Sequence, residues 1–320
     1  MTDLNPSDSV QTARFCAMKS FMKLAYGEIR DGLDFAIVGV PSDAGSFYRV
    51  GARFGPQAIR EASMLLRPYN QALDIDVFEH CSGVDSGDVP IIPGNIDDSF
   101  DAIVSFASPL VEKRITPIFL GGDHAITLGE LRVVAAQYGP VGLVHFDAHA
   151  DTRDESFGRR YSNGTPFRRA VEEGLLDMRH AIQVGMRGPI YSRQDLRSTL
   201  DLGFDVLTSY DVREMGIPAT LNRIREKVAG VPVFLSFDID FVDPAYAPGT
   251  GGPEPGGFTS AEALHFVRGL SGLDFVAFDL VELLPSFDPT QITAVLAANI
   301  VYEFLSLIAL GRSEIGETRL

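Results

Sequence analysis

Short apolar segments recur along the chain, and each is followed by a turn that carries Gly or Asp and then by a helical pattern. The segments are Phe35–Val40, Ile115–Leu120, Val141–Phe146, Ala181–Val184, Phe204–Leu207, Val231–Phe237 and Phe275–Val281. Runs this short and this apolar are typical of strands that helices cover on both faces. Helical patterns such as Leu128–Tyr138, Ile217–Val228 and Thr259–Leu270 alternate with them. The alternation predicts an α/β fold with a mainly parallel sheet and helices on both faces.

The chain has 320 residues, a length that would allow two domains. It contains no linker-like stretch of low complexity, no charge block and no internal repeat. The longest irregular segment, Pro244–Gly257, lies between a predicted strand and a predicted helix, which favours an active-site loop over a domain boundary. We therefore expect one domain over residues 13–320, preceded by a flexible segment at residues 1–12.

The charge balance restricts the possible partners. Lys and Arg number 27 against 43 Asp and Glu, which gives a net charge of −16. This charge argues against nucleic acid and against an anionic membrane surface. No run of about 18 uncharged apolar residues predicts a membrane span. The two cysteines are too few for a disulfide framework, and the segment MTDLNPSDSVQTARF lacks the pattern of a signal peptide, so we expect a cytoplasmic protein.

The segment HFDAHAD, residues 145–151, concentrates charge at the end of a predicted buried strand. Its residues Asp147, His149 and Asp151 follow one another at every second position. In an extended chain such residues share one face, so we expect their side chains to converge. An isolated motif of this kind is more often a helix cap or a surface segment than a metal site. The ends of other strands decide between the two interpretations.

Two further strand ends carry the same kinds of group. LSFDID supplies Asp238 and Asp240, and FLGGDH supplies His124 after a Gly-Gly turn that lets the backbone approach closely. The carboxyl ends of strands in an open α/β sheet are where ligands bind. Four clustered carboxylates would repel one another without cations, and six ligands suit two ions about 3.5–4 Å apart. Oxygen donors with two imidazoles favour Mn²⁺, with Ni²⁺, Co²⁺ or Zn²⁺ as alternatives.

Several motifs in order resemble the ureohydrolase family of arginases, agmatinases and guanidino-acid amidinohydrolases. The motifs are YRVGARFGPQAIR, GGDHAITLGELR, HFDAHADT, GTPFRRAVEEGLLD, SFDIDFVDPAYAPGTGGPEPGG and DLVELLPSFDPT. Together they span roughly residues 13 to 310. The segments APGTGGPEPGG and RFGP are more similar to agmatinase-like and guanidinobutyrase-like members than to true arginases. The resemblance implies a three-layer arginase-like fold and a homo-oligomer, either a trimer or a hexamer.

The resemblance also implies roles for individual residues. One ion would be held by His124, Asp147, Asp151 and Asp238. The other would be held by His149, Asp147, Asp238 and Asp240. Water activated by the ions would attack the guanidino carbon, and Asp151 would pass a proton to the leaving amine. Glu282 corresponds to the family glutamate that pairs with the guanidinium of the substrate, and the products would be urea and an amine.

Two positions depart from the family pattern and complete the candidate catalytic and substrate-binding set. Asn163, in RRYSNGTPFRR, stands where relatives usually have a proton-shuttling histidine, and an amide has no pKa near neutrality. It can still hydrogen-bond a substrate or water, and natural divergence and an engineered change both fit. Arg153 stands where guanidino-acid enzymes often have Asn, and either pairs with a carboxylate tail or points to solvent. The other histidines, His80, His145, His180 and His265, lie in no motif that places them at the site.

Four functions fit these residues. The leading prediction is a metal-dependent amidinohydrolase that acts on a guanidino acid or an agmatine-like compound. The second is a biguanide hydrolase of the same family, of the metformin type, acting with nickel and as a heteromer. The third is a single-zinc amidohydrolase related to histone deacetylases, which would not need both His124 and Asp240. The fourth is a silent subunit of an active partner, which the complete ligand set disfavours.

Overall fold

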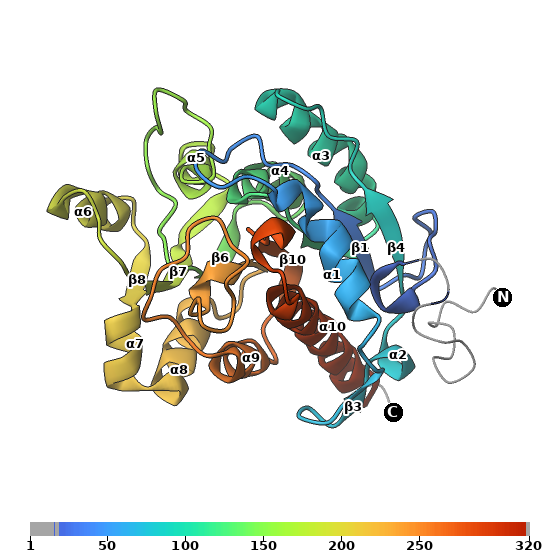
Figure 1. Ribbon diagram of the computed structural model, residues 1–320. Coiled ribbons are helices and arrows are strands. Elements are labelled where there is room, and N and C mark those ends of the chain that lie inside the picture. The colour runs from blue at the N-terminus through green and yellow to red at the C-terminus, as the bar shows by residue number, and fades with distance from the viewer. Residues whose placement is uncertain (1–15, 17–18, 318–320) are drawn as a thin grey trace.

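Eight parallel strands form the centre of the computed structural model, which describes residue 16 and residues 19–317 (Figure 1). In spatial order the strands are β4 (Gly83–Asp88), β1 (Phe35–Gly39), β5 (Thr116–Leu120), β10 (Phe275–Val281), β9 (Val233–Asp238), β6 (Val141–Phe146), β7 (Leu176–Met186) and β8 (Asp205–Thr208). All neighbouring strands pair in parallel. The predicted sheet is confirmed, and the predicted flexible segment 1–12 lies outside the described residues.

Helices cover both faces of this sheet and give the three predicted layers. One face packs against α1 (Gly55–Ser63), α7 (Ser209–Met215), α8 (Ile217–Lys227), α9 (Ser260–Arg268) and α10 (Ile292–Glu317). The other face packs against α3 (Ile96–Glu112), α4 (Thr127–Tyr138) and α5 (Pro166–Glu172). Neighbouring residues of β5 show the alternation, because Ile118 and Leu120 join one apolar cluster and Phe119 joins the other.

The remaining elements lie around these layers. They are α2 (Val77–His80), α6 (Arg193–Asp201), the antiparallel pair β2 (Tyr69–Asn70) and β3 (Ile75–Asp76), and five single-turn helices. The single turns are η1 (Phe21–Lys23), η2 (Ala52–Phe54), η3 (His124–Ile126), η4 (Ile239–Phe241) and η5 (Pro285–Phe287). Two of these turns follow strands that end at the candidate site, η4 directly after β9 and η3 after the short turn that follows β5.

One described helix, α10, is long and apolar enough over Ile292–Ser313 to cross a membrane by length and composition alone. Most of its apolar window, 78%, is buried inside the domain. Its acidic residue Glu303 is also buried, and it accepts hydrogen bonds from Arg268 at 2.6 Å and from Asn70 at 2.9 Å. The burial explains the apolar sequence of this helix as that of a core element.

Candidate metal centre and active-site cleft

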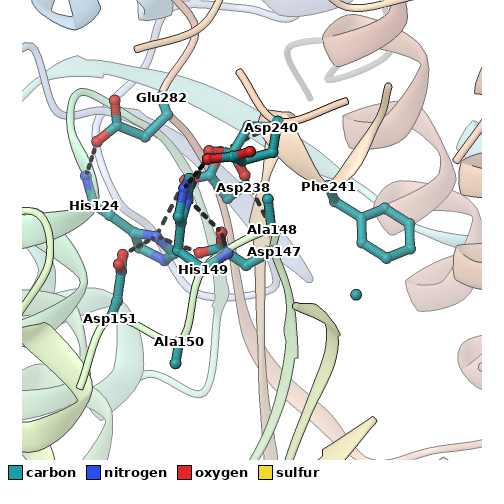
Figure 2. Close-up of polar contacts among 12 residues, drawn as sticks. His124, Asp147, Ala148, His149, Ala150, Asp151, Asp238, Asp240, Phe241 and Glu282 are labelled. Carbon is teal, nitrogen blue, oxygen red and sulfur yellow. Dashed lines mark hydrogen bonds and ion pairs between the residues drawn. The ribbon is translucent and has the colours of Figure 1, made fainter. Parts of the chain in front are cut away.

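Four adjacent strands bring the predicted metal ligands and Glu282 to one edge of the sheet (Figure 2). The strands β5, β10, β9 and β6 lie side by side, and their carboxyl ends lead into the segments that carry these residues. The Gly-Gly turn after β5 packs as expected, because a Cβ on Gly122 would lie 1.8 Å from the carbonyl oxygen of Ser42. The sheet therefore supplies the convergence that the motifs predicted.

The first group of donors surrounds Nδ1 of His124. This atom lies 3.2 Å from Oδ2 of Asp147 and 3.0 Å from Oδ2 of Asp151. It also lies 3.3 Å from Oδ2 of Asp238, and it is buried with no hydrogen-bond partner. Donors that bind one ion at about 2.0–2.2 Å lie roughly 3 Å apart. The spacing and the unpaired nitrogen therefore fit a bound cation.

The second group of donors surrounds Nδ1 of His149. This nitrogen lies 3.1 Å from Oδ2 of Asp240 and 3.4 Å from Oδ1 of Asp147. Asp147 thus presents one carboxylate oxygen to each of the two histidines, His124 and His149. A carboxylate placed in this way can bridge two ions, and the donor set of oxygens and imidazoles suits manganese.

Without bound cations, the clustered acids are difficult to ionise together, and the shifted pKa values of these carboxyl groups show this. Burial and then the neighbouring Asp240 and Asp147 raise the pKa of Asp238 well above its usual range. Burial and then Asp147 raise the pKa of Asp240 to about 6. Burial would also raise the pKa of Asp147, but His145 and the other histidines around it hold it well below its usual range. Bound divalent cations would relieve this repulsion.

The backbone bends sharply at two of the site residues. Asp151 has a φ of 50° and Glu282 a φ of 63°, a region that residues other than glycine seldom adopt. HFDAHAD was expected to stay extended through Asp151, and this was wrong, because β6 ends at Phe146 and the chain then turns. The turn and the strained φ, rather than strand alternation, bring Asp151 to His124.

Glu282 uses its two carboxyl oxygens differently. Its Oε1 accepts hydrogen bonds from the backbone N–H of His124 at 3.0 Å and from Nδ2 of Asn163 at 3.3 Å. Its Oε2 is buried with no partner among the described residues. Burial, and after it the charge of Asp123, raises the pKa of Glu282 to about 8. Glu282 lines the cleft, so the free oxygen is available to a cationic ligand.

The cleft above the candidate metal centre encloses about 890 Å³. Asn163 and Arg153 both line it, together with the exposed aromatic residues Phe157 and Tyr191. The guanidinium of Arg153 lies over the Tyr191 ring, 5.2 Å from its centroid, and pairs with no acid among the described residues. The predicted loop Pro244–Gly257 contributes Gly251 and Gly252 to the lining.

The sequence interpretation missed two residues at the site. His145 was placed in no motif, yet its Nε2 lies 2.8 Å from Oδ2 of Asp147. Its position near the end of β6, two residues before Asp147, is the signal that could have identified it. The second is Arg187, which is buried beside the site and donates to the backbone carbonyls of Gly185, Asp240, Phe241, Val242 and Glu254.

Comparison with known proteins identifies similar chains. The model of the arginase family matches residues 33–306. Guanidinobutyrase of Pseudomonas aeruginosa is 42% identical over 306 residues, which cover 95% of this chain and 96% of that protein. Mitochondrial agmatinase of Gallus gallus is 42% identical over 303 residues, which cover 95% of this chain and 89% of that protein. The structure of proclavaminate amidinohydrolase from Streptomyces clavuligerus matches with a TM-score of 0.89 and 40% identity. The match covers 93% of this chain and 99% of that structure.

Proposed function

Because this chain belongs to the arginase family of guanidino-compound amidinohydrolases, we propose that its substrate is a guanidino acid. The reaction would convert R–NH–C(NH₂)₂⁺ and water into R–NH₃⁺ and urea, with cleavage of the bond from the guanidino carbon to the substituted nitrogen. Guanidinobutyrase, one of the similar proteins, is named for a substrate of this kind. The observation that carries the proposal is the position of Arg153 in the cleft without an acidic partner among the described residues.

Six side chains would hold two divalent ions, with manganese as the proposed metal and nickel as the alternative. His124, Asp147, Asp151 and Asp238 would bind one ion, and His149, Asp147, Asp238 and Asp240 would bind the other. The fit rests on two observations. Nδ1 of His124 has no hydrogen-bond partner, and Asp147 presents one carboxylate oxygen to His124 and the other to His149. When bound, the ions supply a nucleophile from water at neutral pH and offset the clustered negative charge.

Glu282 would bind the guanidinium of the substrate. A carboxylate and a guanidinium form a charge-assisted pair, and Oε2 of Glu282 lacks a partner in the protein. His124 and Asn163 hold the other oxygen, so the carboxyl plane is fixed before the substrate arrives. This fixed orientation would place the guanidino carbon beside the metal centre and lower the entropy cost of the reaction.

Asp151 would carry a proton to the leaving nitrogen. Its carboxyl group lies 3.0 Å from Nδ1 of His124, and the residue also lines the cleft. It is thus within reach both of the metal centre and of a bound substrate. Transfer to the substituted nitrogen converts a poor leaving group into a neutral amine as the C–N bond breaks.

Arg153 would bind the carboxylate at the far end of the substrate. Tyr191 supports the guanidinium from one side, which leaves its N–H donors free for a carboxylate. Agmatine has a cationic amine at that end, and Arg153 would repel it. The side chain therefore favours a guanidino acid over agmatine.

The test compares substrates on the metal-loaded protein. Urea release would be measured from 4-guanidinobutyrate, agmatine and metformin, with Mn²⁺ and Ni²⁺ supplied separately. We expect 4-guanidinobutyrate to give the highest kcat/KM. In Arg153→Gln, kcat/KM should fall at least tenfold for 4-guanidinobutyrate and stay level or rise for agmatine. Preference for agmatine or metformin in the unaltered chain would contradict the proposal.

The same assay separates the remaining interpretations. Turnover by the chain alone excludes a silent subunit, whereas activity that needs a second kind of chain supports a heteromer. The predicted trimer or hexamer and the cytoplasmic location stay predictions. Sedimentation velocity of the purified protein would measure the oligomeric state.

A further inference from the structure

Four buried polar side chains stand in register across the middle of the sheet, behind the candidate metal centre. Backbone pairing aligns Gln183 on β7 with His145 on β6, His145 with Ser236 on β9, and Ser236 with Asp279 on β10. All four are fully buried. Buried polar groups cost free energy unless they are hydrogen-bonded, so their bonds indicate why the sheet carries them.

The hydrogen bonds of Gln183 determine which nitrogen of His145 carries a proton. Nε2 of Gln183 lies 2.7 Å from the backbone carbonyl oxygen of Ala150 and 3.0 Å from Nδ1 of His145. A carbonyl oxygen only accepts, so the atom that faces Ala150 must be the amide nitrogen. Its second N–H then donates to Nδ1 of His145. Because Nδ1 of His145 accepts this hydrogen bond, it carries no proton. In the neutral imidazole the proton is therefore on Nε2 of His145.

The protonated nitrogen of His145 faces a proposed metal ligand. Nε2 lies 2.8 Å from Oδ2 of Asp147, the oxygen that also lies 3.2 Å from Nδ1 of His124. His145 is close enough to His124 and Asp147 for the three to form a candidate ion site. A nitrogen that carries a proton has no lone pair to offer a cation, so the hydrogen bond excludes His145 from the ligand set.

We infer that His145 is a positioning residue for Asp147, held in one tautomer by Gln183. The inference rests on the proposed role of Asp147 as a metal ligand. Donation from His145 fixes the carboxylate in the plane that presents Oδ1 toward His149 and Oδ2 toward His124. Partners of this kind orient metal ligands, and their loss typically lowers metal affinity about 10–100-fold.

The tautomer itself can be observed without any metal. Metal-free protein labelled with ¹⁵N-histidine contains six imidazoles, and the signals lost in His145→Gln identify residue 145. We expect an unprotonated Nδ1 and a protonated Nε2 in the unaltered chain. A protonated Nδ1, either in the other tautomer or in an imidazolium, overturns the inference. In Gln183→Met the same signals should shift toward a mixture of tautomers.

Metal binding tests the consequence for the site. Calorimetric titration with Mn²⁺ alone would compare the unaltered chain with His145→Phe, which removes the donor, and with His145→Gln, whose amide can still donate. We expect a loss of at least tenfold in the affinity of one ion in His145→Phe and in Gln183→Met, and near-normal affinity in His145→Gln. His180→Gln is the matched control, because His180 bonds the carbonyl of Lys227 and lies outside the site.

The outcomes separate this inference from the proposed function. An unaltered chain that binds neither Mn²⁺ nor, in a parallel titration, Ni²⁺ contradicts the proposed function. An unaltered chain that binds two ions, with His145→Phe binding both equally well, contradicts the inference alone. Thermal unfolding of each metal-free variant shows whether that variant is folded. If His145→Phe does not fold, the histidine spectrum of the unaltered chain tests the inference by itself.

Discussion

A side-chain hydrogen bond joins Asn163 to Glu282, with Nδ2 of the amide donating to Oε1 of the carboxylate at 3.3 Å. Burial and then the charge of Asp123 raise the pKa of Glu282 to about 8, so the carboxylate is costly to form at neutral pH. A donor that bonds the charged form lowers that cost. Asn163 therefore places a neutral donor, which has no pKa near neutrality, beside the proposed substrate-binding carboxylate.

Asn163→Asp should move the activity profile to higher pH. The new carboxylate cannot donate a hydrogen bond and adds a like charge, so the pKa of Glu282 rises further. The ionised form of Glu282, which would bind the substrate, is then populated only at higher pH. We expect about a tenfold loss in kcat/KM for 4-guanidinobutyrate at pH 8, with recovery as the pH increases. The measurement is kcat/KM from pH 6 to 10 at constant metal content. An unchanged profile would show that this hydrogen bond does not control Glu282.

Asn163→His should raise turnover on simple guanidino substrates roughly tenfold. An imidazole can donate to Glu282 as the amide does, and it can also carry protons between the cleft and solvent. The gain should be largest near pH 7–8, where an imidazole of pKa about 6.5–7 changes its charge readily. Initial rates of urea release for both proteins across this range provide the comparison. Equal rates at every pH would mean that no proton passes through this position.

Glu282→Gln should retain both ions and lose most of the activity. The amide keeps the shape of the side chain but gives up the charge, and a charge-assisted hydrogen bond contributes about 1.5–3 kcal/mol. One such bond corresponds to a decrease in kcat/KM of roughly 10–150-fold. Elemental analysis of the same sample confirms that the metals are present. A metal-replete variant with near-normal kcat/KM would assign Glu282 a structural role.

Each chain should bind two divalent ions after purification with excess Mn²⁺. Asp240 contacts His149, whereas His124 contacts the other three acids, so Asp240→Ala should reduce the metal content from two ions to about one. Inductively coupled plasma analysis of dialysed protein measures the stoichiometry. One ion per chain in the unaltered protein, unchanged in Asp240→Ala, would rule out the binuclear site.

Metal-free protein should lose stability as the pH rises from about 5 to 8. The folded-state pKa values of Asp240, Asp123 and Glu282 are raised to about 6, 7 and 8, above their unfolded values. Such acids stabilise the fold below their unfolded pKa, and that contribution is lost as the pH rises through the folded pKa. Bound Mn²⁺ should reverse the trend. Thermal unfolding with and without Mn²⁺ checks it, and a Tm of the metal-free protein that rises over this interval would contradict it.

The fold could be predicted from sequence where strands are buried on both faces. Seven apolar segments correspond to strands of the sheet, because covered parallel strands leave a continuous apolar signal. The strand β4 was missed, since its sequence GVDSGD is polar and rich in Gly. It lies at the edge of the sheet, where pairing with β1 and the buried Asp85–Arg60 ion pair hold it in place. Contacts of that kind are not visible in a local pattern.

The clustering of the candidate ligands could be predicted from the sequence, but the contacts that position them could not. Convergence of Asp147, His149 and Asp151 was expected from an extended chain, but a turn with a strained φ at Asp151 produces it. The role of His145 depends on Gln183, which lies 38 residues away in sequence and one strand away in space. Residues that position a ligand are set by the register between strands, and a single sequence gives no measure of register.

Arg187 gives the cleft one wall that can move only as a unit. Its guanidinium donates to carbonyls at the end of β7, in the turn after β9 and in the loop around Glu254. Independent motion of any of these segments would break bonds from a buried charge, which is costly. Phe47 and Phe157 also line the cleft, and they contact each other edge to face with ring centroids 5.0 Å apart and with both residues exposed. We expect substrate entry and urea exit to depend on this exposed aromatic pair, while the wall tied by Arg187 keeps its shape.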